Sequence, residues 1–335
     1  MSDQGQLYLR KWNVTIASAT AGLDLSELHI KFKINQSDLQ TPNNARIRIY
    51  NLSQDRSSQL LGKEFDRVVV SAGYVNGPYG VIFDGQIKQT LRGKESQIDT
   101  FLDIYAAEGD EAYNYSISAG SLAAGSTLKQ RIDAYAKSMG LEVGYISIGL
   151  AVNPSALARG AVFFGLSKNY LRQEAIANNA RWSIQNGKLV FISNSDYIQA
   201  EPIVLSPASG LIGIPTQTQA GISAKALLNP NFTIGQPVKI DSTLINAAPT
   251  DSFFTLRSPT QIQPGPNGSA KDNALAFTTL SPIAGAGLYR VVVSEYEGDT
   301  RGNDWYSDLI CFAISPDVTP GSAVSSWPGA TTSPP

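Results

Sequence analysis

The stretch Leu28-His29-Ile30-Lys31-Phe32-Lys33-Ile34 places an apolar side chain at every second position. This is the period of a β-strand with one buried face and one face turned to solvent. Arg46-Ile47-Arg48-Ile49-Tyr50 repeats the alternation a few residues later. The two segments therefore predict adjacent strands of an antiparallel sheet.

The rest of the first hundred residues carries the same signal. A short helix is expected from its cap at Ser53 to about Leu61. Another strand follows at Arg67–Tyr74, and then a long hairpin whose arms are Gly80–Leu91 and Gln97–Ala107, with a turn at Arg92–Glu95. About six strands in this length are typical of a small antiparallel barrel, which we place at residues 1–107.

The periodicity changes after Glu108 and predicts an α+β module over residues 108–200. A helix is expected at Ser126–Met139, where Ser126 can cap its start, and a second helix at Ser167–Asn179. A strand is expected at Leu141–Ile148. The dipeptide Asn186-Gly187 predicts a tight hairpin turn between Arg181–Gln185 and Lys188–Ile192.

Strand signal resumes near Pro202 and predicts a second barrel over residues 201–314. A proline-rich segment at about 241–286 interrupts it and reads as a long loop. A second long hairpin follows at residues 287–314, and the tail at residues 315–335 has the composition of a disordered segment. The predicted fold is mainly β with an α+β module, in which two tube-like antiparallel β-barrel domains flank a small helix–strand domain.

The composition excludes several classes of protein. Only 16% of the 335 residues are charged, against roughly 25% in a typical domain, and the net charge of −2 gives no general affinity for nucleic acid. The single cysteine excludes a disulfide framework within the chain. The N-terminal residues lack the apolar core of a signal peptide, and no apolar run is long enough to predict stable membrane insertion.

Residues that could act as a nucleophile or a base are few. His29, the only histidine, falls on the polar face of its strand and is expected to be a solvated surface residue. Cys311 lies within an apolar strand and is expected to be a buried small hydrophobe. A Ser-His-Asp triad would have to use His29, and the chain has no G-x-S-x-G elbow.

Two acidic clusters also favour structural roles. Glu108, Asp110 and Glu111 stand at the boundary between two predicted domains, where charges usually solvate a loop. Asp299, Asn303 and Asp304 share one glycine-containing turn. Their spacing does not match an EF-hand, so a hairpin turn is favoured over a calcium site.

The remaining candidates also favour structural roles. The segment 120–126 precedes a helix but lacks the lysine of a phosphate-binding loop, which favours a flexible entry to the helix. Tyr113, Tyr115 and Trp182 are not accompanied by the basic residues that a base-stacking site would need, and they are expected to pack in a core or an interface. We therefore predict no catalytic, cofactor-binding or metal-binding residue, and no enzymatic activity.

Four stretches in chain order carry a resemblance to a known family. They are the strand containing Phe83, Gly85 and Ile87; the module from Ser126 to Ile192; the segments 210–218, 226–230 and 235–238; and the closing hairpin, with Gly298, Asp299, Gly302, Asp304 and Trp305. This set resembles the baseplate central hub (gp27-like) proteins of contractile-tailed bacteriophages. It spans roughly residues 7–314, but the segment 241–286 and the tail are not covered.

The resemblance implies a structural hub of the virion that forms a homotrimer. The two barrels of each chain would make a pseudo-six-fold ring, which joins the hexameric tail tube protein to the trimeric central spike protein. Other baseplate proteins, of the wedge or the distal tail, would contact the hub, and DNA would pass through its channel without specific binding. Such a hub would be assembled in the cytoplasm of the host bacterium.

The sequence leaves two other classes of protein open. A tail-associated, cell-wall-degrading glycosidase would need two convergent carboxylates. A carbohydrate-binding adhesin would need an exposed aromatic patch. The sequence also leaves open a related contractile secretion system, whose spike base would share the hub architecture.

Overall fold

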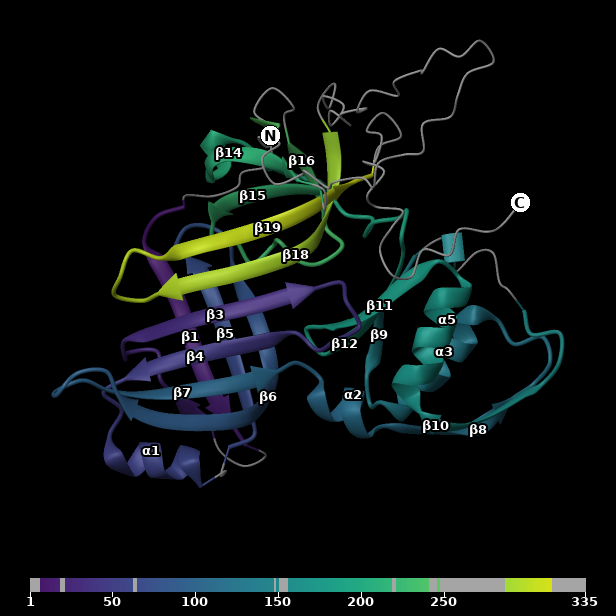
Figure 1. The fold of residues 1–335 in the computed structure, drawn as a ribbon, viewed down its shortest axis with the longest axis horizontal. Coiled ribbons are helices and arrows are strands. Elements are labelled where there is room, and N and C mark those ends of the chain that lie inside the picture. The colour runs from purple at the N-terminus through teal and green to yellow at the C-terminus, as the bar shows by residue number, and fades with distance from the viewer. Residues whose placement is uncertain are drawn as a thin grey trace, which may run out of the picture.

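The computed structural model describes residues 7–18, 22–62, 65–147, 149–150, 156–218, 221–240, 246–247 and 287–314. Within these ranges the fold is mainly β with a small helical part, as the sequence predicts. Figure 1 shows two regions, a large β body and a smaller α+β module beside it.

One large sheet builds the body. Its strands follow each other in the order β17-β14-β15-β19-β18-β3-β4-β7-β6-β5-β1-β2, and β13 and β16 join it through β18. The bounds of the first seven are β1 Arg10–Ala17, β2 Gly22–Asp24, β3 Ile30–Ser37, β4 Asn44–Tyr50, β5 Arg67–Tyr74, β6 Tyr79–Lys94 and β7 Thr100–Ala107. The others are β13 Ile203–Leu205, β14 Leu211–Thr218, β15 Gly221–Leu227, β16 Pro237–Ile240, β17 Asn246–Ala247, β18 Gly287–Asp299 and β19 Trp305–Ala313. All pairs are antiparallel except the short β13–β16 and β14–β17 pairs.

The two halves of the body share this sheet. Residues Val293–Asp299 of β18 pair with Lys31–Ser37 of β3, so the closing hairpin continues directly into the first strands. In Figure 1, β1 and β5 lie behind β3 and β4, and the sheet curls around a core. That core also takes in Leu228, Tyr296 and Trp305 from the second half, which has a further core of its own.

The alternation of apolar and polar residues decides which face of each strand is buried. In β3, Ile30, Phe32 and Ile34 are at most 2% exposed, while Lys31 and Lys33 face solvent. The predicted strand pattern is therefore confirmed at the stretch from which the fold was inferred. The helix α1, Gln54–Leu61, follows β4 as expected and contributes the buried Leu60 to the core.

The α+β module has its own core and two small sheets. Its helices are α2 Asp110–Tyr115, α3 Leu128–Ser138 and α5 Ser167–Ala177; its strands are β8 Ile117–Leu122, β9 Glu142–Ile146, β10 Ala161–Leu166, β11 Ala180–Gln185 and β12 Lys188–Ser193. The β11–β12 hairpin turns at Asn186 and Gly187, both at positive φ, as the dipeptide predicts. The strand β9 joins it in parallel, and β8 pairs with β10.

Three local predictions are corrected. The first long hairpin does not turn at Arg92–Glu95, because β6 pairs with β7 as far as Lys94 and the turn comes at residues 95–99. Helix α3 is capped by Thr127 rather than Ser126, since the Thr127 hydroxyl accepts the Gln130 N–H and the Gln130 side chain accepts the Thr127 N–H. The segment 120–126 is not simply a flexible helix entry, because Gly120–Leu122 complete strand β8.

Two further predictions fall largely outside the described residues. Of the predicted loop at 241–286, only β17 is described, and it pairs with β14. The tail at residues 315–335 lies entirely outside.

Glycines opposite aromatic rings leave room for the rings between neighbouring strands of the sheet. Gly298 is the cross-strand neighbour of Phe32, and a Cβ at Gly298 would lie 2.2 Å from the Phe32 ring. Trp305 packs edge-on to the same ring at 5.6 Å between centroids and is 1% exposed. Gly93, within the predicted turn, has the same relation to its cross-strand neighbour Phe101.

Replacing Gly298 by alanine is expected to destabilise the body by about 1–3 kcal/mol, because the new methyl group forces the Phe32 ring out of place. Thermal or urea unfolding of the purified protein measures this. The control is Gly22→Ala, also in a strand, where a Cβ meets its nearest atom only at 4.0 Å. Equal stability of the two variants would contradict the close-packing argument.

Candidate functional site

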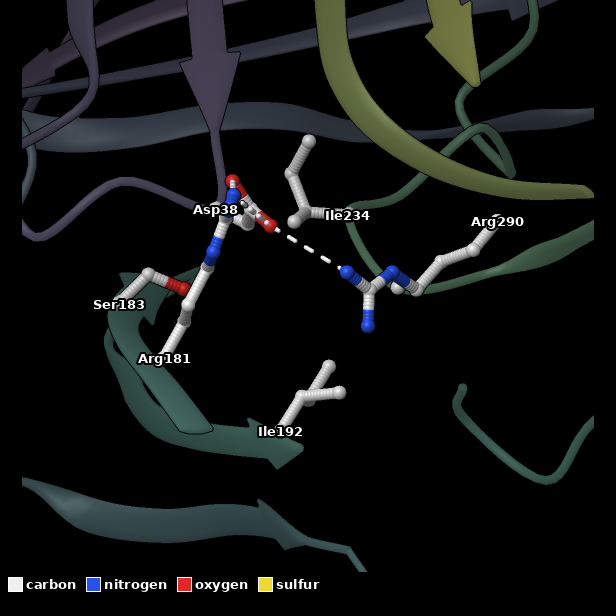
Figure 2. A pocket seen from close by; sticks show the side chains of 7 residues that line it. Asp38, Arg181, Ser183, Ile192, Ile234 and Arg290 are labelled. Carbon is white, nitrogen blue, oxygen red and sulfur yellow. Dashed lines mark hydrogen bonds and ion pairs between the residues drawn. The ribbon is translucent and has the colours of Figure 1, made fainter. Parts of the chain in front are cut away.

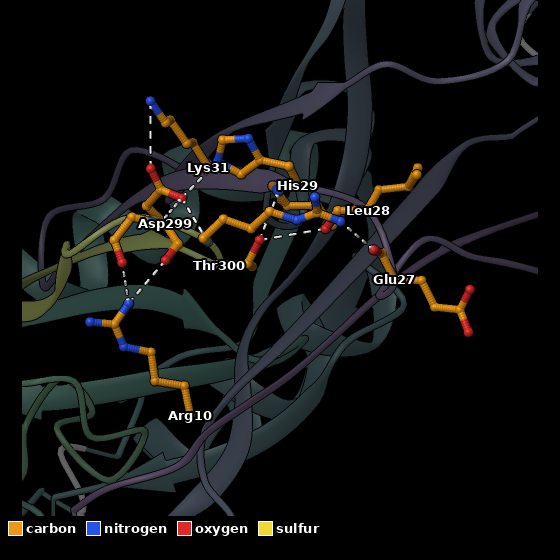
Figure 3. Close-up of polar contacts among 10 residues, drawn as sticks. Arg10, Glu27, Leu28, His29, Lys31, Asp299 and Thr300 are labelled. Carbon is orange, nitrogen blue, oxygen red and sulfur yellow. Dashed lines mark hydrogen bonds and ion pairs between the residues drawn. The ribbon is translucent and has the colours of Figure 1, made fainter.

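The turn between β18 and β19 is built around the carboxylate of Asp299 (Figure 3). Its Oδ1 accepts the backbone N–H groups of Arg301 at 2.9 Å and Gly302 at 2.7 Å, and Lys31 Nζ lies 3.5 Å from Oδ2. Burial alone would raise the pKa of Asp299, but these backbone hydrogen bonds and the one from His29 outweigh it and hold the pKa below its usual value. Asp299 is therefore an ionised, structural carboxylate.

The other residues of this turn do not converge on a metal ion. The side chains of Asn303 and Asp304 are exposed, and the Asp304 carbonyl closes the hairpin by accepting the Asp299 N–H at 2.7 Å. A Cβ at Gly302 would lie 2.4 Å from Asp299 Oδ2, so only glycine fits there. These contacts are those of the hairpin turn that the sequence favoured over a calcium site.

Arg10, at the start of β1, fastens the turn to the opposite side of the body. Its guanidinium donates to the carbonyls of Asp299, Gly302 and Asn303 at 3.1, 2.7 and 2.9 Å. It also lies over the Trp305 ring, 5.4 Å from the centroid. Residues almost 300 positions apart in sequence are thus joined, as Figure 3 shows.

His29 is not the solvated surface residue that its position in the alternation predicted. Its Nε2 lies 2.7 Å from Asp299 Oδ1, and its ring stacks on Tyr50 at 4.5 Å between centroids. The side chain is 27% exposed. The prediction was wrong because the turn that meets His29 comes 270 residues later in the chain, and strand alternation does not reveal such a partner.

The first predicted motif residues form part of the core of the body. Phe83 is fully buried and Ile87 packs against the same core. A Cβ at Gly85 would lie 2.6 Å from the Phe83 ring and 2.9 Å from the backbone of Ala107. Gly85 thus permits a close approach of backbone and ring, whereas the register shifts of β6 fall on either side of it.

A buried ion cluster joins the first half of the body, the α+β module and the second half of the body (Figure 2). Asp38, just after β3, accepts two hydrogen bonds from Arg181 of the module, each 2.9 Å long. Arg290 of β18 approaches the same carboxylate at 3.6 Å and donates to the carbonyls of Ser193 and Asp196. Removing one partner of such a buried group typically costs about 3–5 kcal/mol, because a buried charge is left unpaired.

Glu108 forms a second contact between the body and the module. The prediction that it solvates a loop was wrong, because it is fully buried. Asn43 Nδ2 donates to its Oε2 at 2.7 Å, and the Gly187 N–H donates to its Oε1 at 3.0 Å. Burial raises the pKa of Glu108 to about 7. Its companions in the sequence cluster lie on α2, where Asp110 pairs with Lys88 at 2.7 Å and Glu111 contacts Gln86.

Cys311 and the stacked pair of Trp182 and Tyr113 have packing roles, whereas Tyr115 is not packed in a core. Cys311 is buried, and burial raises the pKa of its thiol to about 12, which leaves it protonated and unreactive at neutral pH. Trp182 is buried and stacks on Tyr113, whereas Tyr115 is 74% exposed. Within the described ranges, no group of three His, Cys, Asp or Glu side chains is placed to hold a metal ion, and no helix is long and apolar enough to cross a membrane.

The residues that sequence reasoning missed are Arg10, Asp38, Arg181 and Arg290. Each is a single charged residue at or near the end of a strand, with a partner on another part of the chain. No motif or spacing marks them. Their roles can be seen only once the partners are brought together in space.

These polar clusters bind segments of the chain to one another. The chain belongs to the baseplate hub gp41 family, which matches residues 12–263. It is therefore a structural component of a bacteriophage tail baseplate, and so of the virion, and not an enzyme. No curated protein matches the chain significantly.

Two solved structures share the fold at low sequence identity. The 43 kDa tail protein of prophage MuSo2 from Shewanella oneidensis is 8% identical, with a TM-score of 0.51 over 90% of this chain and 96% of that protein. A tail protein from Neisseria meningitidis MC58 is 10% identical, with a TM-score of 0.53 over 93% of this chain and 99% of that protein. At such identities the likeness establishes the fold alone.

Replacing Asp299 by alanine is expected to destabilise the protein by about 1–3 kcal/mol, because the N–H groups of the turn lose their acceptor. Chemical unfolding at pH 7 measures the loss, and Asp304→Ala in the same turn is the control with an exposed side chain. Since the pKa of Asp299 is lowered by folding, its contribution is complete above the usual pKa of an aspartate and is lost as the pH falls through the lowered value. A gap between wild type and variant that persists in strong acid would contradict this role.

The raised pKa of Glu108 predicts a pH dependence of stability opposite in sign to that of Asp299. Its pKa is raised by folding, so between about pH 4.5 and pH 7 the folded protein holds a proton that the unfolded chain releases, and stability falls as the pH rises through this window. Glu108→Gln, neutral throughout, is expected to flatten this fall by up to about 3 kcal/mol. Unfolding of both proteins from pH 5 to pH 8 tests it, with the exposed Glu111→Gln as the control expected to retain the wild-type slope. An unchanged slope in Glu108→Gln would refute the assignment.

Proposed function

We propose that this baseplate protein is the central hub of a contractile tail and acts as a homotrimer. Three copies form a pseudo-six-fold ring that joins the hexameric tail tube to the trimeric central spike and surrounds the DNA channel. The other baseplate proteins bind around it, and the hub is assembled in the cytoplasm of the host bacterium. DNA passes through the ring without being specifically bound.

The observation that carries this proposal is a strand order that occurs twice. The neighbours β14-β15-β19-β18 and β3-β4-β7-β6 each consist of two antiparallel strands followed by the two arms of a long hairpin, the second arm first. One chain thus contains two units of the same topology. Three such chains supply six units, the number that a six-fold partner requires.

The contact between the two units supports a ring. Within the chain, the first arm of one hairpin, β18, pairs with β3, the first strand of the other unit. In a ring, the corresponding first arm β6 faces β14 of the next copy. Among the described strands, residues 88–94 of β6 pair only with β7, so the other edge of this segment has no strand partner, and the outer edge of β14 is paired only with the two residues of β17.

The alternatives derived from the sequence have less support. A glycosidase conflicts with membership of a structural family. The adhesin requires a surface gathering of aromatic side chains, whereas the described aromatic pairs are mainly core contacts around Trp305, Trp182 and Tyr135. Phe164 and Tyr115 are strongly exposed, but neither takes part in these pairs.

The mass of the purified protein tests the proposal. Native mass spectrometry, alone and with the purified tail tube and spike proteins, is expected to show three copies of the 35.8 kDa chain, either alone or once a partner is added. A strict monomer under all these conditions would overturn the trimeric hub.

A further inference from the structure

The two long hairpins leave the sheet at the same end. A row of directly opposed residues crosses the sheet from the second hairpin to the first. It pairs Asp299 with Lys31, Lys31 with Arg48, Arg48 with Asp103, and Asp103 with Leu91. The turn between β18 and β19, called the closing turn below, therefore begins level with Leu91. The first hairpin continues three residues further, to Lys94, which is about 10 Å at the rise of a β-strand. Figure 1 shows both turns at the left end of the body.

The α+β module lies at the other end of these strands. β3 begins beside the closing turn, where Ile30 bonds to Thr300, and ends next to Asp38, which contacts Arg181 of the module. Asn43, just before β4, contacts Glu108 and Gln185. Each chain therefore presents two hairpin turns at one end and one module at the other.

The turn of the first hairpin is held rigidly and displays an apolar side chain. Ser96 Oγ accepts the N–H groups of Ile98 and Asp99 and donates to the Asp99 carboxylate. The Asn51 side chain ties Asp99 and Thr100 to the end of β4. Ile98 is left 87% exposed, more than any other large apolar side chain among the described residues.

The closing turn is equally well held but is polar at its surface. Asp299 and Arg10 fix its backbone, as described above, while Arg301, Asn303 and Asp304 are exposed. Neither turn has to be ordered on binding, so the entropy that a flexible loop loses in an interface is largely avoided.

We infer that these two turns, residues 95–99 and 300–304, form the surface that receives the tail tube, with Ile98 as its apolar anchor. The inference rests on the proposed trimeric hub. Each chain contributes two hairpin turns, so three chains present six turns at this end, which fits a six-fold partner, whereas the three modules at the opposite end fit a three-fold one. An exposed apolar side chain on a rigid support loses its contact with water when a partner covers it, and little conformational entropy is lost in doing so.

The test uses the full-length protein with the purified tail tube and spike proteins of the same phage. Ile98→Asp is expected to weaken tube binding at least about tenfold, as loss of an interface anchor does, while the mass of the trimer and spike binding are unchanged. Ser96→Ala retains Ile98 but loosens its turn, and is expected to weaken tube binding to a smaller extent. The matched control is Val162→Asp, an 85% exposed apolar residue of the module, which is expected to bind the tube normally.

Two results would overturn the inference while leaving the hub intact: tube binding by Ile98→Asp at the wild-type affinity, or loss of tube binding in Val162→Asp but not in Ile98→Asp. A wild-type protein that never forms a trimer would instead refute the proposed function on which the inference rests.

Discussion

The pairing of β18 with β3 is the contact on which the rest of the body depends. The two strands are more than 250 residues apart in sequence, yet their hydrogen bonds merge two units of the same topology into one sheet. A sheet cannot shift by one residue without turning every buried side chain outward. The register between Val293–Asp299 and Lys31–Ser37 therefore fixes the position of the second unit relative to the first.

Several independent contacts secure this register. Gly298 admits the Phe32 ring, and Trp305 then packs on the same ring from the following strand. At one end of β3, the closing turn is held by His29 and Arg10; at the other end, Asp38 binds Arg290 of β18. A slip of the pairing would disrupt all of them together. The same buried charges also connect the module, because Asp38 is shared with Arg181.

The sequence predicted what depends on neighbouring residues and missed what depends on distant ones. Alternation located β3 and β4, and Asn186-Gly187 located a turn, because both signals are local. His29 and Glu108 were misjudged for one reason: each looks solvated beside its sequence neighbours, but each is covered by a segment from another part of the chain. Arg10 and Asp38 gave no signal, since a lone charged residue does not identify its partner.

On the outer face of the shared sheet, charged side chains are paired across adjacent strands. Lys33 lies near Glu295, Arg46 and Arg48 bind Asp103, and Lys225 lies near Asp308, each pair on adjacent strands. The exposed pairs of Lys33 with Glu295 and of Lys225 with Asp308 add little stability, so their effect is mainly on the charge that the face presents, whereas the Asp103 carboxylate is only 4% exposed. Affinity for DNA comes from lysine and arginine side chains that neutralise phosphates. If this face of the sheet lines the channel of the proposed ring, its cations are already paired with acidic neighbours across the strands, and such a surface would hold a passing duplex weakly.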